Sequence, residues 1–395
     1  MTERLYYHDS SVLAFTARVI DLKQVGETAH VILDRSAFYP TSGGQLFDTG
    51  TLGDIAVKDV LEEDGEVIHV LDGAPSFRVG DQIDGRIDAP RRRDNMQKHT
   101  GQHILSRALI EIGDAATVSS RLGEDDCTVE LNRESLDEDL VRRAEIRANE
   151  IIFENRPVTI NVVPHAKLSE FPLRKIPDRQ EGDYRIVTIA DYDWSACGGT
   201  HCRATGSVGL IKITTHEKLR GHLRLHFLTG LLALDDYRWR YDQIETIANQ
   251  LTRHGRESAA AVAALSEETT RLRRKVGELR KGLLPTLING WLEKAVTWRD
   301  VTIVPLDFFG EDFKDAKDTA LAVISRRPVV AIAGCDDKLL IAVAKDVPFS
   351  AADLLKKTAA KHGGRGGGSP QLAQGGGFAV EVVKVLLAHP ETVFD

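Results

Sequence analysis

Short runs in which apolar and polar residues alternate fill the chain up to about residue 88, with glycine and aspartate between the runs. An apolar residue at every second position predicts half-buried strands. We expect these strands at 13–22, 29–33, 55–61, 67–71 and 82–87. Because the strands are short and the turns are regular, they favour a small antiparallel β-barrel over residues 1–88.

A helical period begins near Arg91 and carries His99 and His103 into an apolar stretch. A second helix is predicted over 136–155, with acidic residues in its first turn and arginines later, as the helix dipole favours. Strand-like segments follow at 157–163, 184–190 and 208–214. This mixture predicts an α+β domain over residues 89–230.

A heptad pattern marks the next segment, residues 231–290. Apolar positions recur at alternating steps of three and four, at Val262, Leu265, Thr269, Leu272, Val276, Leu279 and Leu283. Such a seam predicts a long helix in a coiled coil, and we expect Gly282, Pro285 and Gly290 to break it. Its partner would be another helix of this chain or a second copy, as in a homodimer.

The last segment, residues 291–395, predicts a separate α/β domain. Strands are expected at 301–306, 329–333 and 339–343, and helices at 314–325, 351–361 and 376–388. Between the last two helices, residues 362–378 are dense in glycine. This composition predicts either a flexible linker or a backbone that approaches a ligand closely, and Arg365 within it is a donor suited to phosphate.

Composition narrows the class of protein. The 395 residues have a net charge of −8, from 51 basic and 59 acidic side chains, so nucleic-acid binding would depend on local basic patches. Four cysteines are too few for a disulfide scaffold and fit a reducing cytoplasm. No apolar run approaches the length that spans a bilayer. The candidate basic patches lie at 91–98, 271–281 and 356–365, where a solvated helix face is the alternative interpretation.

Two short segments carry candidate metal ligands. His99 and His103 share one helix face, while Cys197 and His201 flank two glycines that predict a tight loop. Taken alone, each pair is weak evidence for a metal, because histidines four residues apart are common on helix surfaces and a single cysteine is common in apolar cores. Together they offer three imidazoles and one thiolate, a set that suits one tetrahedral Zn²⁺ per chain. The remaining cysteines are interpreted as structural, and no His-Glu-x-x-His motif supports a zincin-type protease.

Four motifs resemble those of the alanyl-tRNA editing family, found in the editing half of alanyl-tRNA synthetase and in freestanding AlaX proteins. Residues 99–103 (HTGQH) and 197–201 (CGGTH) are similar to its two zinc motifs, and residues 38–45 (FYPTSGGQ) to the glycine loop of its barrel. Residues 363–374 resemble the signature of a C-terminal domain shared with DHH phosphoesterase-type proteins, which is linked to tRNA binding in the synthetase. The motifs follow the family's order, and the chain resembles the long freestanding form.

The resemblance implies a zinc-dependent deacylase that hydrolyses tRNA(Ala) mischarged with serine, with glycine as a second misacylating amino acid. It implies His99, His103, Cys197 and His201 as zinc ligands, Thr41 as the sensor of the serine hydroxyl and Gln45 as a residue of the pocket. Nucleotide and ATP binding are further expectations from the likeness to the synthetase. We also expect a grip on the tRNA body by Lys356, Lys357, Lys361 and Arg365.

The route of hydrolysis stays open at this point. Four protein ligands close a tetrahedral site, so either one ligand is displaced or the zinc only positions the substrate. No acidic residue lies beside either motif in an obvious base position. The alternatives are a structural zinc protein that binds RNA or a partner without hydrolysis, and a metal-dependent phosphoesterase. The latter is weak, because the Asp-His-His motifs of such enzymes are absent.

Overall fold

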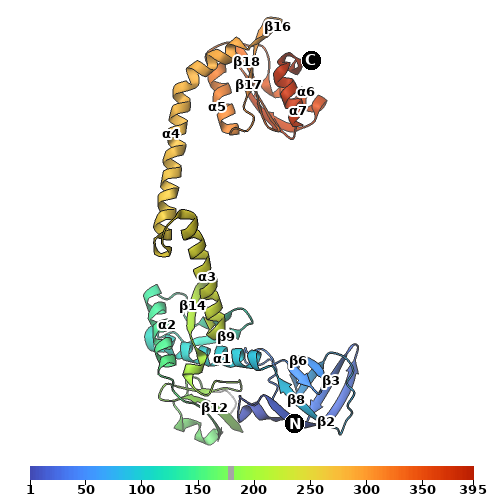
Figure 1. The fold of residues 1–395 in the computed structure, drawn as a ribbon, viewed down its shortest axis with the longest axis vertical. Helices are drawn as coiled ribbons and strands as arrows, with labels where there is room; N and C mark the ends of the chain where they lie inside the picture. The colour runs from blue at the N-terminus through green and yellow to red at the C-terminus, as the bar shows by residue number, and fades with distance from the viewer. Residues whose placement is uncertain (177–181) are drawn as a thin grey trace. The chain divides into compact units, whose positions relative to one another are not determined.

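The computed structural model describes residues 1–176 and 182–395 as an α+β protein of several sheets (Figure 1). The chain divides into two compact units, Met1–Gly255 and Arg256–Asp395. In the described part, no helix has both the length and the apolar character needed to cross a membrane.

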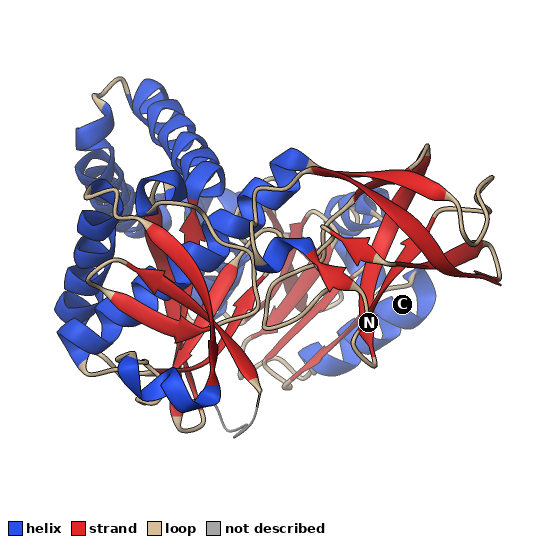
Figure 2. Ribbon diagram, turned by 90° about the horizontal axis from the view of Figure 1, so that it is seen from below, coloured by secondary structure: helices blue, strands red, loops and turns tan. Residues whose placement is uncertain are grey.

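The N-terminal strands close into a barrel, drawn in red near the N-terminus in Figure 2. The buried side chains alternate along β3, which places Ala29, Val31 and Leu33 in the barrel core. A short pair, β1 (Glu3–Arg4) and β4 (Arg35–Ser36), lies beside it. The barrel order is β2 (Ala14–Val25), β3 (Thr28–Leu33), β7 (Glu66–Leu71), β6 (Ile55–Glu63), β5 (Gly50–Leu52) and β8 (Gln82–Ile87).

Helix α1 (Ala89–Gly113) follows the barrel and is the central helix of the next module. Asp88 caps its first turn by accepting a hydrogen bond from the Arg91 backbone, and Pro90 occupies an early position where no N–H is needed. Beside it lie α2 (Glu138–Phe153) and two sheets. One has the order β14 (Ile211–Leu219), β15 (His222–Thr229), β10 (Cys127–Leu131), β9 (Thr117–Leu122); the other has β11 (Val158–Pro164), β12 (Asp183–Ile189), β13 (Asp193–Ala196).

Several of these strands are absent from the sequence-based prediction. In β15 the residues Leu223, Leu225 and Phe227 are buried and alternate with partly exposed polar residues. The period-two signal was therefore present in the sequence and was missed. β9 and β10 were missed because they are short and lie between the stronger helical patterns of α1 and α2, and β13 because it has only four residues.

The heptad segment forms α3 (Gly230–Leu251) in the first unit and α4 (Ser258–Glu293) in the second. The predicted break at Gly282, Pro285 and Gly290 is wrong, because α4 continues through all three. Leu284, Ile288 and Trp291 pack against the core of the second unit, and this burial outweighs the cost of a proline in the helix. The seam itself is exposed, with Val276 at 54% and Leu279 at 58%, so the coiled coil stays a prediction.

The second unit is built on a six-stranded sheet with apolar cores on both faces. Only β17 and β18 pair in parallel. The strand order is β16 (Val296–Trp298), β17 (Val301–Asp307), β18 (Val329–Cys335), β19 (Lys338–Val343), β21 (Leu372–Gly376) and β20 (Arg365–Gly368). Besides α4, the α-helices of this unit are α5 (Phe313–Ile324), α6 (Ala351–His362) and α7 (Val380–Ala388).

The glycine-rich segment is ordered into strands, which corrects the interpretation as a flexible linker, while a close approach of its backbone to a ligand stays a prediction. β20 and β21 form an antiparallel hairpin at the sheet edge, and the predicted helix at 376–388 begins only at Val380. A side chain at Gly366 or Gly368 would overlap the backbone of the partner strand. The glycines therefore permit close strand pairing, in place of the flexibility that their number suggests.

Candidate metal centre

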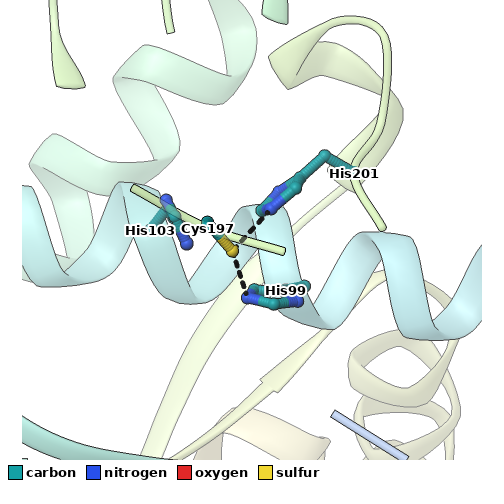
Figure 3. A group of neighbouring side chains, drawn as sticks. All are labelled: His99, His103, Cys197 and His201. Carbon is teal, nitrogen blue, oxygen red and sulfur yellow. Dashed lines mark hydrogen bonds between the residues drawn. The ribbon is translucent and has the colours of Figure 1, made fainter. Parts of the chain in front are cut away.

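Helix α1 and the loop after β13 bring the predicted ligands to one place (Figure 3). His99 and His103 lie one helical turn apart with ring centroids separated by 5.2 Å. The loop carries Cys197 and His201 onto the same side of α1. One candidate ligand atom from each of the four residues lies within 4.8 Å of those of the others.

Distances within the cluster fit the edges of a tetrahedral site. Cys197 Sγ lies 3.3 Å from Nε2 of His99 and 3.3 Å from Nε2 of His201. Bond lengths usual for Zn–S and Zn–N place two tetrahedral ligand atoms about 3.5 Å apart. The four side chains could therefore hold a zinc-sized ion with little rearrangement.

The electrostatics of the cluster favour the forms that bind metals. Burial alone would raise the pKa of the Cys197 thiol, but the neighbouring His99 and His201 rings and its hydrogen bonds hold it well below its usual value. Burial, together with the nearby His99 ring, lowers the pKa of His201 to about 3. A thiolate beside a neutral imidazole is the donor state that Zn²⁺ requires.

Each imidazole has a partner on the side away from the cluster centre. Gln45 Oε1 accepts a hydrogen bond from His99 Nδ1 at 2.7 Å, and Thr100 Oγ1 lies 3.3 Å from His201 Nδ1. Asp193 Oδ2 lies 3.4 Å from His103 Nδ1. Hydrogen bonds occupy Nδ1 of His99 and of His201 and leave Nε2 of each ring for a metal, whereas Asp193 only lies at contact distance from His103 Nδ1, which makes no hydrogen bond within the described residues.

A cavity of about 620 Å³ opens beside the cluster. One wall carries the cations Arg174 and Lys175, which suit an anionic substrate. The cavity is lined by Tyr39, Ser42, Gly43, His99, Gln102, His103, Ile110, residues 116–120, Arg174, Lys175 and residues 195–199.

The whole length of the chain aligns with a protein of known type. The alanyl-tRNA editing protein AlaX-L of Pyrococcus horikoshii is 32% identical over 413 aligned residues, which cover 100% of this chain and 97% of that protein. The chain belongs to the alanyl-tRNA editing family. The resemblance inferred from the four motifs is thereby confirmed.

Further relatives of this editing-family member are longer. The alanine–tRNA ligase of Pyrococcus abyssi is 31% identical over 95% of this chain, which spans only 42% of the ligase. Family models for "tRNA synthetases class II (A)" and for the "Threonyl and Alanyl tRNA synthetase second additional domain" match residues 2–91 and 184–226. A crystal structure of the C-Ala domain of Aquifex aeolicus alanyl-tRNA synthetase matches 24% of this chain and 95% of that domain, at 26% identity and a TM-score of 0.22.

Asp193 lies at the cluster of this editing-family member, and it is absent from the residues predicted from the sequence. Asp193 is 1% exposed and contacts His103 Nδ1, so it is an outer partner of the cluster and not a base that faces the cavity. It also accepts a hydrogen bond from Ser195 Oγ at 2.8 Å, and Arg174 lies 3.7 Å away. Since alternate residues of a strand share one face, Asp193, Ser195 and Cys197 could have been grouped from their spacing.

Thr41 and Gln45 lie apart from the cavity lining that the described residues form. Thr41 is exposed, and its hydroxyl accepts a hydrogen bond from the Phe47 backbone at 3.2 Å. Gln45 is fully buried behind His99. The structure therefore brings Gln45 to the cluster, whereas it places Thr41 in the loop that leads there.

The predicted basic patches at 91–98 and 356–365 differ in how far their cations are exposed to solvent. In the patch at 91–98, Arg92 is fully buried in an ion pair with Asp48, and the Lys98 amine donates to the carbonyls of Gly123 and Glu124, so both are internal. The C-terminal set is exposed, on α6 and at the start of β20: Lys356, Lys357, Lys361 and Arg365.

Proposed function

We propose that this protein is a zinc-dependent aminoacyl-tRNA deacylase that hydrolyses tRNA(Ala) mischarged with serine, with glycine as a second misacylating amino acid. The observation that carries the proposal is the cluster of His99, His103, Cys197 and His201 at the wall of a cavity. The editing activity named for the relative from Pyrococcus horikoshii supports the same substrate class. Translation takes place in the cytoplasm, and we propose that location for the protein.

The four donors would hold one zinc ion per chain. When bound, zinc supplies Lewis acidity toward a carbonyl or a water. The chain's own residues keep the donors in place: Gln45, Thr100 and Asp193 orient the three imidazoles, and the Gly199 N–H donates to Cys197 Sγ at 3.4 Å. Arg174 lies between Asp193 and the cavity, where its charge offsets that of the buried carboxylate.

Discrimination between serine and alanine has to depend on one hydroxyl. A small apolar pocket rejects such an isostere poorly, whereas a pocket with hydrogen-bonding groups leaves them unpaired when alanine enters. The cavity offers such groups, among them Ser42, Gln102 and Ser120. This lining supports hydrolysis of the seryl ester in preference to the correct alanyl ester.

Deacylation of purified substrates tests the proposal. Ser-tRNA(Ala), Gly-tRNA(Ala) and Ala-tRNA(Ala) are incubated with the full-length protein, with and without a chelator, and the released amino acid is measured. We expect hydrolysis of the serine ester, loss of activity with the chelator and recovery with added zinc. The glycine ester, which lacks the hydroxyl, measures whether the site also accepts an amino acid smaller than alanine. A structural zinc protein that binds RNA would retain tRNA binding and release no amino acid, and this result would refute the proposed activity.

Thr41 is proposed to contribute to serine selection by holding the loop that reaches the site. Thr41→Val keeps the shape and removes the acceptor of the Phe47 N–H. Losing this hydrogen bond loosens the loop by about 1 kcal/mol, so we expect the Ser/Ala ratio of kcat/KM to fall, by about fivefold at most, at unchanged zinc content. Thr28→Val is the control, because Thr28 Oγ1 donates to Val25 at a distant barrel turn. An unchanged ratio in Thr41→Val would assign discrimination to the cavity lining alone.

The exposed cations of α6 and β20 are proposed to bind the tRNA body. Replacing Lys356, Lys357, Lys361 and Arg365 together by alanine should raise KM about tenfold and leave kcat and zinc content unchanged. Each lost phosphate contact should reduce the slope of log K against log salt by about 0.9. The matched control replaces four cations elsewhere in the same unit: Lys314, Lys317, Arg326 and Arg327. Equal KM and salt slope in both variants would refute the tRNA grip.

Two predictions from the sequence remain. One is a homodimer formed through the exposed seam of α4, and the other is the binding of nucleotides or ATP.

A further inference from the structure

We infer that Gln45 is a positioning residue that couples the N-terminal barrel to the metal centre, so that metal binding and docking of the barrel loop stabilise one another. The inference rests on the proposed zinc site and goes beyond it. The sequence motif indicated that Gln45 lines the pocket. The inference instead places its role behind the ligands, on the side away from the cavity.

The loop that carries Gln45 is held closely on both sides. Ser42 and Gln45 exchange backbone hydrogen bonds at 3.2 and 3.0 Å, which closes the loop on itself. The Gly44 carbonyl accepts from the Leu122 N–H at 2.8 Å, which joins the loop to β9. Gly44 has φ +82°, and a Cβ there would lie 2.5 Å from the Ser120 carbonyl oxygen. The approach to β9 therefore requires glycine at this position.

The Gln45 amide contacts both halves of the ligand set. Its Oε1 accepts from His99 Nδ1 at 2.7 Å and from the Thr200 N–H at 3.1 Å. Its Nε2 donates to Thr200 Oγ1 at 2.9 Å. One fully buried side chain thus joins the helix that carries His99 and the loop that carries Cys197 and His201. An unpaired amide in this position would be costly, which makes the arrangement specific.

The hydrogen bond to Nδ1 selects the form of His99 that can bind a metal. Because Oε1 is an acceptor, the proton of the neutral ring stays on Nδ1 and the lone pair of Nε2 faces Cys197 Sγ. If the barrel loop left the site, His99 would lose this orientation. Docking of the loop and binding of zinc are linked equilibria, and such linkage is reciprocal. The factor by which the docked loop strengthens zinc binding is therefore also the factor by which zinc favours the docked loop.

The test compares zinc binding in the full-length wild type and in Gln45→Met, which keeps the length of the side chain and removes its polar atoms. We expect the zinc dissociation constant, measured by competition with a chromophoric chelator, to rise about 10- to 100-fold. The absorption spectrum of the cobalt(II)-loaded protein should shift, because the orientation of one ligand changes. In the wild type, zinc should slow hydrogen exchange of residues 38–48, and Gln45→Met should lose this effect.

Three further variants separate positioning from simple stability. Ser36→Ala removes a buried barrel hydrogen bond to His69 without touching the cluster, and it should keep the wild-type zinc affinity. Gln45→Glu retains an acceptor for His99 Nδ1 and should recover part of the affinity. Thr200→Val leaves Gln45 in place but removes the acceptor of its Nε2, and it should weaken zinc binding if Gln45→Met does not fold.

The outcomes distinguish the inference from the proposed function. A wild type that binds no zinc would refute the proposed zinc site and the inference with it. A wild type that binds zinc and edits, with Gln45→Met unchanged in affinity, cobalt spectrum and zinc-dependent exchange, would refute the inference alone.

Discussion

Replacing Cys197 by alanine should abolish zinc binding and deacylation together. Cys197 Sγ lies against both His99 and His201, and it is the donor of the cluster whose charge compensates that of the ion. We expect zinc content to fall from about one ion per chain to less than about 0.1, and hydrolysis of Ser-tRNA(Ala) to fall to background. Elemental analysis and deacylation of the same preparation measure the two losses.

Cys202→Ala is the matched control for this experiment. Cys202 is adjacent to His201 and buried, but burial raises the pKa of its thiol to about 11, so it stays protonated. Its removal should leave zinc content unchanged. Full metal occupancy in Cys197→Ala would exclude Cys197 as a ligand and leave a histidine-only site.

Gly199→Ala should disrupt the centre, whereas Gly198→Ala should be tolerated. A Cβ on Gly199 would overlap the His99 ring and approach Gln45 Oε1 to 3.1 Å. At Gly198 the nearest atom to an added Cβ is Tyr7 Oη at 3.5 Å, an ordinary contact. Overpacking of this kind costs about 1–3 kcal/mol, so zinc affinity should fall about 5- to 150-fold in Gly199→Ala, and in this variant alone of the two.

Zinc titration of the two glycine variants provides the measurement, and thermal unfolding shows whether each variant is folded. Equal zinc affinities of Gly198→Ala and Gly199→Ala would mean that the loop of residues 197–201 can shift away from α1 at little cost. The tight packing of Gly199 against His99 would then have no part in shaping the site.

The sequence predicted the candidate ligands because their spacing is local. His99 and His103 share a helix face by periodicity, and the glycine pair between Cys197 and His201 indicates a tight loop. That these two segments meet is a tertiary fact, which the complementary ligand set and the resemblance to a family made an expectation, and which no local pattern shows.

The residues that contact the outer nitrogen atoms of the ligands also differ in whether a local sequence pattern indicates them. Asp193 was within reach of the strand pattern, since it precedes Cys197 by an even number of residues. The contact between Gln45 and Thr200 spans 155 residues of chain, and no local pattern indicates it. The glycine-rich hairpin was missed for another reason: strand propensity describes side chains, whereas close backbone pairing admits residues that have none.

The buried pair of Arg92 and Asp48 has a consequence for how the first unit responds to heat. The Arg92 guanidinium also donates to the carbonyls of Ser10 and Ala37, so all of these partners come from the barrel side of the junction with α1. Separating barrel from helix would break an ion pair that has no exposure to water and leave each charge without its partner. Melting of the barrel and melting of the helical module should therefore be a single calorimetric transition, although each has an apolar core of its own.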